Sequence, residues 1–375
     1  MSEYQCYDFV AIDRPLTSDE MEELRAISTR AEISSTRFFN EYNWGQLRRD
    51  PAGILARYFD AFLYHANWGW NRFMLRLPAK SGLLPELKPY FPGGPSTLTE
   101  SGEHLIIDLR SDTEEQGEYW HADRLDDLAP LRTDLLERDL SAAYLAWLLA
   151  VQSEDEVVAP SAKEPPVPPG LRNPSPALEA LIDFLRIDED LVKAAGEGSP
   201  TESTDADLLR SWVSALPASD KDRWLMQAIE DPHAKIRTGL IAAFRRERAT
   251  KQAGRRSVSQ LLSRAEELRI ERERKEAEKA EKARRLEEKK RKQYLAALTK
   301  EGSAAWSRVE QLLESKKNDD AVNLTMDLHA AALDSGDRRQ FEEELKALRE
   351  RHPRRRKYFQ SVRRELESKH REMLS

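Results

Sequence analysis

The stretch NWGWNRFMLRLP at residues 67–78 decides the fold class of the first part of the chain. Beyond its turn residues, apolar and basic side chains alternate. Phe73, Leu75 and Leu77 fall on one side, and Arg72, Met74 and Arg76 fall on the other. Successive side chains of a strand point to opposite faces of a sheet, so this alternation predicts a half-buried strand. The run EHLIIDLR at residues 103–110 predicts one more strand.

The residues before this strand switch between strand-like and helix-like patterns. Residues 4–12 and 32–42 look extended. Thr17 and Glu20 form a capping-box signature for one helix, and Pro51 suits the first turn of another. The apolar face expected for that second helix consists of Ile54, Leu55, Tyr58, Phe59, Phe62 and Leu63. The order strand, helix, strand, helix, strand, strand predicts an α+β domain over residues 1–124, with its helices on one face of a sheet.

The next part of the chain has helical patterns. We predict a helical extension at residues 125–160 and a helical domain of short helices at residues 177–250. The prolines between them exclude both a helix and a central strand, so residues 161–176 are expected to be an extended connector.

Residues 257–298 contain no Gly or Pro and are dominated by charge. The middle of this run has a single large apolar residue, Leu286, and therefore lacks the seam that a coiled coil requires. Glutamates precede basic residues by four positions, as in Glu281 and Arg285, and each such pair contributes about 0.2–0.5 kcal/mol to a helix. We predict a long charged single helix that acts as a spacer. A basic nucleic-acid-binding helix is the alternative.

The last part of the chain returns to amphipathic patterns. Residues 299–352 predict a helical hairpin or repeat unit, and residues 353–375 predict a basic helix or tail. The expected fold class is thus an α+β N-terminal domain followed by mostly α-helical regions, with α structure predominant overall.

The composition restricts the class of protein. The 375 residues carry a net charge of -7, and Cys6 is the single cysteine, so an internal disulfide and a cysteine-based zinc site are excluded. No run of about 18 apolar residues and no signal-peptide pattern is found, which predicts a cytoplasmic protein with no membrane partner. Residues 1–150 have a balance of -10, whereas residues 251–300 have +8. This contrast suggests different partners for the two ends, or docking of one end on the other.

Several segments resemble an uncharacterised bacterial protein family: AIDRPLT, NEYNWG, ANWGWNRFMLRLP, YLAWLLAVQ, EPPVPPGL and DFLRIDEDL. Residues 306–352 also resemble the helical C-terminal region of bacterial SWIM zinc-finger proteins. A SWIM zinc site needs several cysteines, so this chain cannot carry that site itself. The resemblance implies a bacterial accessory protein with a SWIM zinc-finger protein as a candidate partner, and it implies no activity.

Motifs of catalysis are weak. His121 and Asp123 have the spacing of the first two ligands of a facial iron triad, but the later histidines fall in helical or tail segments. We interpret this stretch as a loop before a helix, whose N-terminal end favours Asp126 and Asp127. Cys6 is expected to be a core residue rather than a nucleophile. No phosphate-binding loop, dinucleotide fingerprint, HExxH helix or GxSxG elbow is found, so no catalytic, cofactor-binding or metal-binding residue is assigned.

The tripeptide Asn-Trp-Gly occurs twice, at residues 43–45 and 67–69. Asn and Gly tolerate left-handed backbone, so two structural turns are the favoured interpretation, one after a strand and one after the predicted apolar helix. If both turns lie at the same edge of the sheet, they create one surface. The residues of this candidate partner-binding surface are Trp44, Trp68, Trp70, Arg72 and Arg76.

The basic C-terminal end combines cationic and aromatic side chains. A candidate nucleic-acid contact consists of Arg354, Arg355, Arg356, Lys357 and Tyr358, since arginines and lysines bind phosphates and rings stack on bases. A solvated tail is the simpler interpretation of the same residues.

The predicted function is a non-enzymatic bacterial scaffold or adaptor that mediates protein–protein interactions. One alternative is a nucleic-acid-binding accessory component of a defence or DNA-handling system. The other is an enzyme with an unrecognised site in the N-terminal domain.

Overall fold

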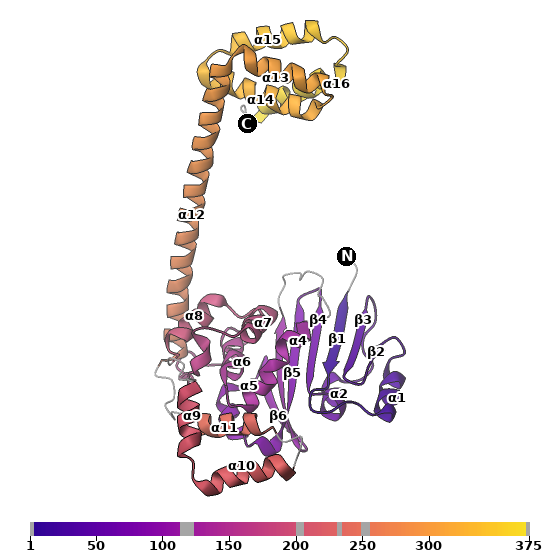
Figure 1. Ribbon diagram of the computed structural model, residues 1–375, viewed down its shortest axis with the longest axis vertical. Coiled ribbons are helices and arrows are strands. Elements are labelled where there is room, and N and C mark those ends of the chain that lie inside the picture. The colour runs from indigo at the N-terminus through magenta and orange to yellow at the C-terminus, as the bar shows by residue number, and fades with distance from the viewer. Residues whose placement is uncertain (1–3, 113–123, 200–205, 231–234, 249–255, 373–375) are drawn as a thin grey trace. The chain divides into compact units, whose positions relative to one another are not determined.

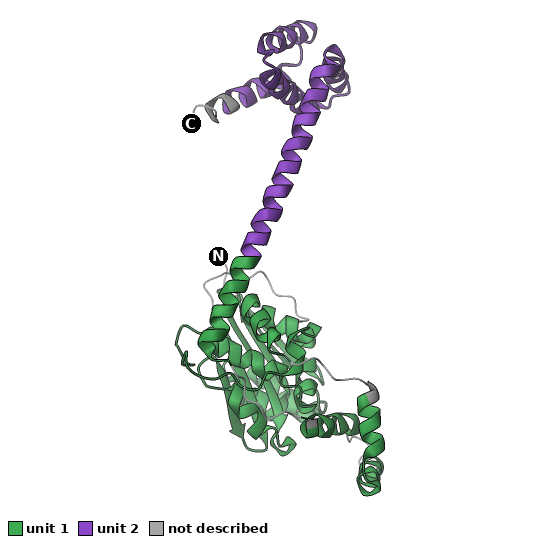
Figure 2. Cartoon of the chain, turned by 90° about the vertical axis from the view of Figure 1, so that its left-hand side faces the viewer, with its two compact units in different colours: residues 1–271 green, residues 272–375 purple. Residues whose placement is uncertain are grey.

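A computed structural model describes residues 4–112, 124–199, 206–230, 235–248 and 256–372. The chain divides into two compact units, residues 1–271 and residues 272–375 (Figure 2). The division falls inside helix α12 (Val258–Glu301). The predicted fold class is confirmed, because an N-terminal sheet with helices is followed by helices alone.

The first unit is built around a seven-stranded antiparallel sheet in the order β2-β3-β1-β4-β5-β7-β6. Its strands are β1 (Gln5–Val10), β2 (Glu32–Ile33), β3 (Arg37–Tyr42), β4 (Ala61–Ala66), β5 (Trp70–Pro78), β6 (Ser96–Ser101) and β7 (His104–Asp112). The strands predicted around residues 4–12, 32–42, 72–78 and 103–110 are therefore confirmed.

The predicted helix that begins at Pro51 is correct at its start and wrong at its end. Helix α2 (Pro51–Tyr58) stops early, and Phe62 and Leu63 belong to the central strand β4. Strand β4 pairs with β1 and β5 along its edges, and helices pack on both of its faces, so its apolar residues are consecutive. A short run of this kind cannot be distinguished from the apolar face of a helix by periodicity.

Helices cover both faces of the sheet, whereas the sequence predicts cover on one face only. Helix α1 (Ser18–Ile27), which begins with the predicted capping box of Thr17, packs with α2 on the face that carries Phe62 and Met74. The opposite face, which carries Leu63 and Phe73, packs against α4 to α8 (Figure 1). The prediction of one covered face is wrong because Met74 lies among the basic residues of β5 and is fully buried.

The remaining elements of the first unit connect or cover the sheet. They are η1 (Ala79–Ser81), α3 (Leu84–Leu87), η2 (Lys88–Tyr90), α4 (Arg124–Leu128), α5 (Pro130–Leu136), α6 (Ser141–Val151), η3 (Pro169–Leu171), α7 (Pro176–Leu185), α8 (Glu189–Glu197), α9 (Ala206–Ala215), α10 (Ala218–Glu230) and α11 (Ile236–Arg248). Residues 161–176 do not separate domains. Glu164 of this segment is buried and accepts hydrogen bonds from Tyr144 Oη at 3.0 Å and Arg256 Nε at 3.1 Å.

A buried ionic network lies at the end of the sheet where β1 finishes. The Asp60 carboxylate accepts hydrogen bonds from the backbone N–H groups of Ile12 and Asp13, at 2.7 and 2.9 Å, and from Arg76 Nη2 at 3.0 Å. The buried Arg132 guanidinium donates two hydrogen bonds to Asp13, at 3.0 and 2.6 Å, and lies 3.3 Å from Asp60. This network fixes a strand, a loop and a helix to one another.

The second unit contains the rest of α12 with α13 (Ser303–Glu314), α14 (Asn318–Ser335), α15 (Arg338–Arg351) and α16 (Arg356–Glu372). Its core includes Leu298, Val309, Leu313, Phe341 and Leu348. Residues 356–372 form a helix, which is one of the two forms predicted for this basic segment. Residues 273–294 of α12 are almost wholly exposed, which is the burial pattern of a solvated helix. No described helix combines the length and apolar character needed to cross a membrane.

Candidate functional site

The strand register places the two Asn-Trp-Gly turns at the same end of the sheet. Gln5, at the start of β1, pairs with Tyr42 at the end of β3 and with Ala66 at the end of β4. One turn follows β3 directly and the other joins β4 to β5. The second turn therefore follows a strand, and the prediction that it follows a helix is wrong for the reason given above for β4.

Both turns are held to the start of β1 by hydrogen bonds. The backbone N–H of Tyr4 donates to Asn67 Oδ1 at 3.0 Å, and the side-chain amide of Gln5 donates to the carbonyl of Gly45 at 2.5 Å. Gly45 and Gly69 have φ angles of +83° and +103°, which only glycine adopts without strain. The turns thus have defined geometry rather than free conformations.

The indole rings of these turns face solvent. Trp44, Trp68 and Trp70 keep 69%, 39% and 54% of their surface exposed. The guanidinium of Arg30 lies over the Trp44 ring, 5.2 Å from its centroid. We call this group of three exposed tryptophans the tryptophan end.

Of the two arginines predicted beside Trp70, the structure brings one close and separates the other. Trp70, Arg72 and Arg76 share one face of β5, because they are two and four residues apart along the strand. Arg76 lies near the other end of the strand, where it binds Asp60 and the carbonyl of Ala56 in a mostly buried position. The inclusion of Arg76 in an exposed patch is therefore wrong, since its charge is needed by a buried carboxylate.

Arg72 belongs to a charged cluster, with Asp108 and Arg110, that the sequence pattern did not predict. It donates two hydrogen bonds of 2.8 Å to Asp108, and Arg110, which pairs with Arg72 across β5 and β7, binds the same carboxylate. Burial raises the pKa of Asp108, but the hydrogen bonds from the two arginines outweigh burial and keep that pKa below its ordinary value. Arg110 has a 58% exposed side chain and is the arginine available to a partner. The alternation of side chains along the predicted strand at residues 103–110 was the sequence signal that could have located Arg110.

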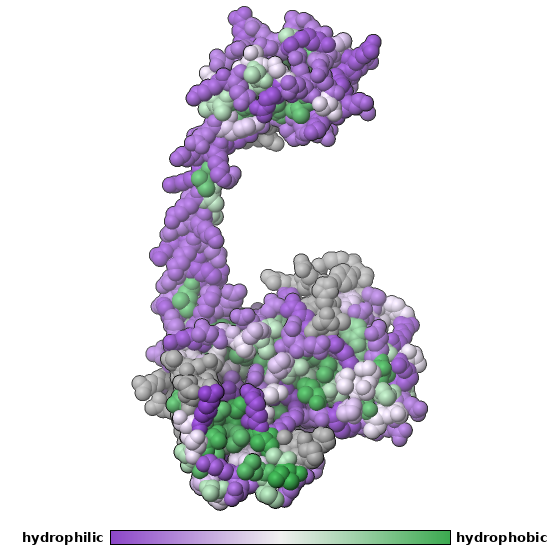
Figure 3. Space-filling model, in the orientation of Figure 1, coloured by the Kyte–Doolittle hydropathy of each residue, from purple (hydrophilic) through white to green (hydrophobic). Residues whose placement is uncertain are grey.

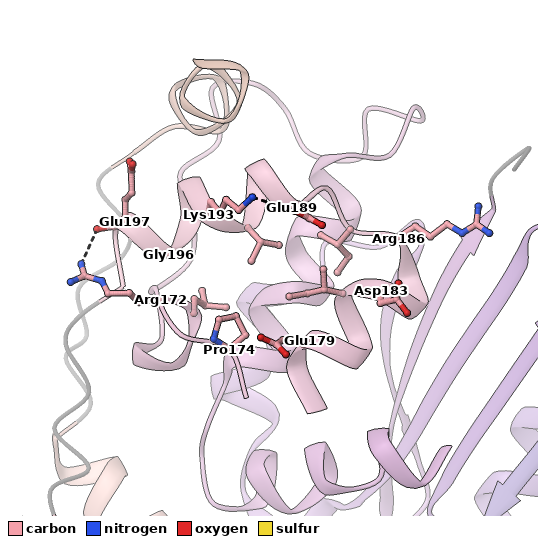
Figure 4. A pocket seen from close by; sticks show the side chains of 13 residues that line it. Arg172, Pro174, Glu179, Asp183, Arg186, Glu189, Lys193, Gly196 and Glu197 are labelled. Carbon is pink, nitrogen blue, oxygen red and sulfur yellow. Dashed lines mark hydrogen bonds and ion pairs between the residues drawn. The ribbon is translucent and has the colours of Figure 1, made fainter. Parts of the chain in front are cut away.

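A groove lies between η3, α7 and α8, on the helical layer of the first unit (Figure 4). It has a volume of about 800 Å³ and an apolar lining that includes Ile182, Ile187 and Val192. Several of its charged residues are bound to neighbours: Lys193 pairs with Glu189, and Glu197 pairs with Arg264. These contacts leave no converging set of acid, base and nucleophile in the described lining.

A second exposed apolar surface lies on the α9–α11 helices, where Figure 3 shows hydrophobic residues gathered. Leu225, Met226 and Ile229 of α10 are 62%, 50% and 73% exposed. Helix α10 has no buried residue. This surface therefore lacks the internal anchoring that the tryptophan end has.

The predicted nucleic-acid contact is divided by the structure. Arg354, Arg356 and Lys357 are exposed and Arg355 is half-buried. Tyr358 is 1% exposed, and its hydroxyl bonds to the hydroxyl of Thr325 on α14. Its prediction as a base-stacking residue is wrong, because the ring fills the core of the second unit.

The residues considered for catalysis do not form a described site. His121 and Asp123 lie outside the described residues. Burial raises the pKa of the Cys6 thiol to about 12, so this thiol remains protonated at neutral pH. No group of three His, Cys, Asp or Glu side chains that could hold a metal occurs within the described ranges.

Comparison with protein-family models, with curated proteins and with solved structures finds no match for this chain.

Proposed function

We propose that this protein is a non-enzymatic adaptor that binds a partner protein through the tryptophan end of its N-terminal sheet. The observation that carries the proposal is the exposure of Trp44 and Trp68 on two anchored turns, and of Trp70 at the start of β5, at one end of the sheet. Exposed indoles held by a folded scaffold lose little entropy when a partner covers them.

The chemistry of this end fits a protein interface. Tryptophan and arginine are the residue types that contribute most to binding energy at interfaces, and here Arg30 and Arg110 accompany the three indoles. The surrounding Arg72–Asp108 pair is mostly buried and supports Arg110 from within the sheet. A partner therefore meets a rigid aromatic surface with a polar rim.

The rest of the chain fits an adaptor that consists of two compact units. Several charges of helix α12 pair with one another along the helix, as in the Glu281–Arg285 pair at 2.7 Å, and its middle is exposed to solvent. The second unit has its own apolar core. In this proposal α12 connects two separately folded binding bodies.

The test compares co-purification by three forms of the full chain in extracts of the source organism. The wild type is compared with Trp44→Ser/Trp70→Ser and with the matched control Leu225→Ser/Ile229→Ser on α10. We expect specific proteins to be lost from the tryptophan variant and retained by the control. The resemblance at residues 306–352 makes a SWIM zinc-finger protein the first partner to look for by mass spectrometry.

Two results would contradict the proposal. One is recovery of the same proteins in equal amount by the wild type and by the tryptophan variant. The other is their loss from both variants alike, which would indicate general damage to the first unit. Circular dichroism of all three forms checks that each variant is folded.

A further inference from the structure

The corner where α15 meets α16 gathers basic side chains within nine residues. We call it the basic corner and define it by Arg349, Arg354, Arg355, Arg356 and Lys357. Four of the five side chains are exposed to solvent, and the fifth, Arg355, is half-buried.

These five residues differ from the other described arginines of helices α13 to α16 in having no acidic partner among the described residues. Arg338 pairs with Glu342 at 3.0 Å, and Arg351 pairs with Glu310 at 2.8 Å. Throughout the part of the chain that the structure describes, no carboxylate lies within ion-pair distance of any member of the basic corner. Like charges held together without counter-charges repel one another, so an anion that binds there relieves this repulsion.

The corner offers charge without apolar contact area. The ring of Tyr358 is buried against α14. The large hydrophobic residues that are exposed in the described part of the second unit are Leu286, Tyr294 and Leu333, and none of them belongs to the corner. An acidic protein partner would need an apolar interface core, whereas arginine and lysine side chains bind phosphate groups without apolar contacts.

We propose that the basic corner binds the phosphate backbone of nucleic acid without reading its sequence. The charge of the whole unit agrees with this, since residues 272–375 carry 28 basic and 21 acidic side chains. With five phosphate contacts, the logarithm of the association constant should fall with the logarithm of salt concentration with a slope of about -4.5 for duplex DNA. Because no ring stacks on bases, a duplex should bind at least as tightly as a single strand of the same length.

The test measures binding of the full chain to a fluorescently labelled DNA duplex of mixed sequence by anisotropy at several salt concentrations. The variant Arg354→Gln/Arg356→Gln/Lys357→Gln removes three exposed charges. We expect its affinity at 0.1 M salt to fall by about two orders of magnitude and its salt slope to become shallower by about 2.7. The matched control Arg274→Gln/Lys279→Gln/Lys289→Gln removes the same charge from exposed positions of α12 and should bind as the wild type does.

Several outcomes would overturn the proposal. Equal loss of affinity in the two variants would show that net charge, not the corner, attracts DNA. Binding of polyglutamate but not of duplex or single-stranded DNA would assign the corner to an acidic protein. Clear preference for a single strand would mean that bases are stacked. Trp44→Ser/Trp70→Ser should keep full DNA affinity, so the two proposals can fail separately.

Discussion

Residues 1–271 bury ion pairs between distant elements, whereas the described part of residues 272–375 buries apolar side chains and one pair of hydroxyl groups. In the first unit Asp60, Asp108 and Arg132 are all buried or nearly so, and each has a partner of opposite charge. In the second unit Thr325 is the one buried polar residue among those described, and it bonds to Tyr358.

The difference shows what remains available for binding in each unit. The first unit uses its arginines largely to fix strands, loops and helices together, and it exposes indoles. The second unit is built from consecutive helices that need no buried charge, so its arginines stay at the surface. The two units therefore offer partners different surfaces. The first unit exposes aromatic rings, and the second unit exposes cationic side chains.

The strongest test of this comparison is Arg132→Leu. Removing Arg132 leaves Asp13 and the buried Asp60 with one cation fewer, and loss of one member of a buried ion pair costs about 3–5 kcal/mol. We expect the free energy of unfolding of the first unit to fall by that amount. Hydrogen exchange of peptides from the second unit should be unchanged, and mass spectrometry of both units in one sample measures this.

The control for this substitution is Arg14→Leu in the same unit. Arg14 pairs with Glu20 at 2.6 Å but is 53% exposed, and exposed pairs contribute about 0–1 kcal/mol. Equal destabilisation by the two substitutions would contradict the importance of buried charge. Faster exchange in the second unit would show that the two units do not unfold separately.

The fold could be predicted from sequence where periodicity was unambiguous. The capping box at Thr17, the start of a helix at Pro51 and the alternation in β5 all led to correct elements. The failure at Phe62 came from tertiary context, because the burial of both faces of β4 depends on the helices that pack on each side of the sheet. The local sequence of β4 does not show which helices cover it.

The candidate site was predictable in its residues but not in its arrangement. The repeated tripeptide identified the tryptophans, yet their location at one end depends on the pairing of Gln5 with both Tyr42 and Ala66. Arg76 and Tyr358 were misjudged for the same reason. Each has the residue type of a binding side chain, and each is taken up by an internal partner that is distant in sequence.

A smaller effect is expected from Asp134→Asn on α5. Burial, together with the neighbouring carboxylates of Asp139 and Glu137, raises the pKa of Asp134 to about 6, against a lowering effect of Arg245. The folded chain thus binds this proton more tightly than the unfolded chain, so ionisation destabilises the fold as pH rises from about 4 through 6. The asparagine variant should melt a few degrees higher at pH 7.5 and equally at pH 4. Thermal melts at both values check this, and a gain of the same size at pH 4 would contradict it.

The smallest effect is expected from a substitution in α12, the charged helix in which the boundary between the two units falls. Glu281 contacts both Arg284 and Arg285 at 2.7 Å, and each pair contributes about 0.2–0.5 kcal/mol, so Glu281→Gln should destabilise the local helix by less than about 1 kcal/mol. Exposed pairs are screened by salt, so the difference from wild type in amide exchange of residues 278–288 should vanish at 1 M salt. Glu273→Gln, at an exposed position with no partner among the described residues, is the control and should have little effect. An effect that persists at 1 M salt would mean that Glu281 is covered by a partner, because a solvated ion pair cannot resist screening of that strength.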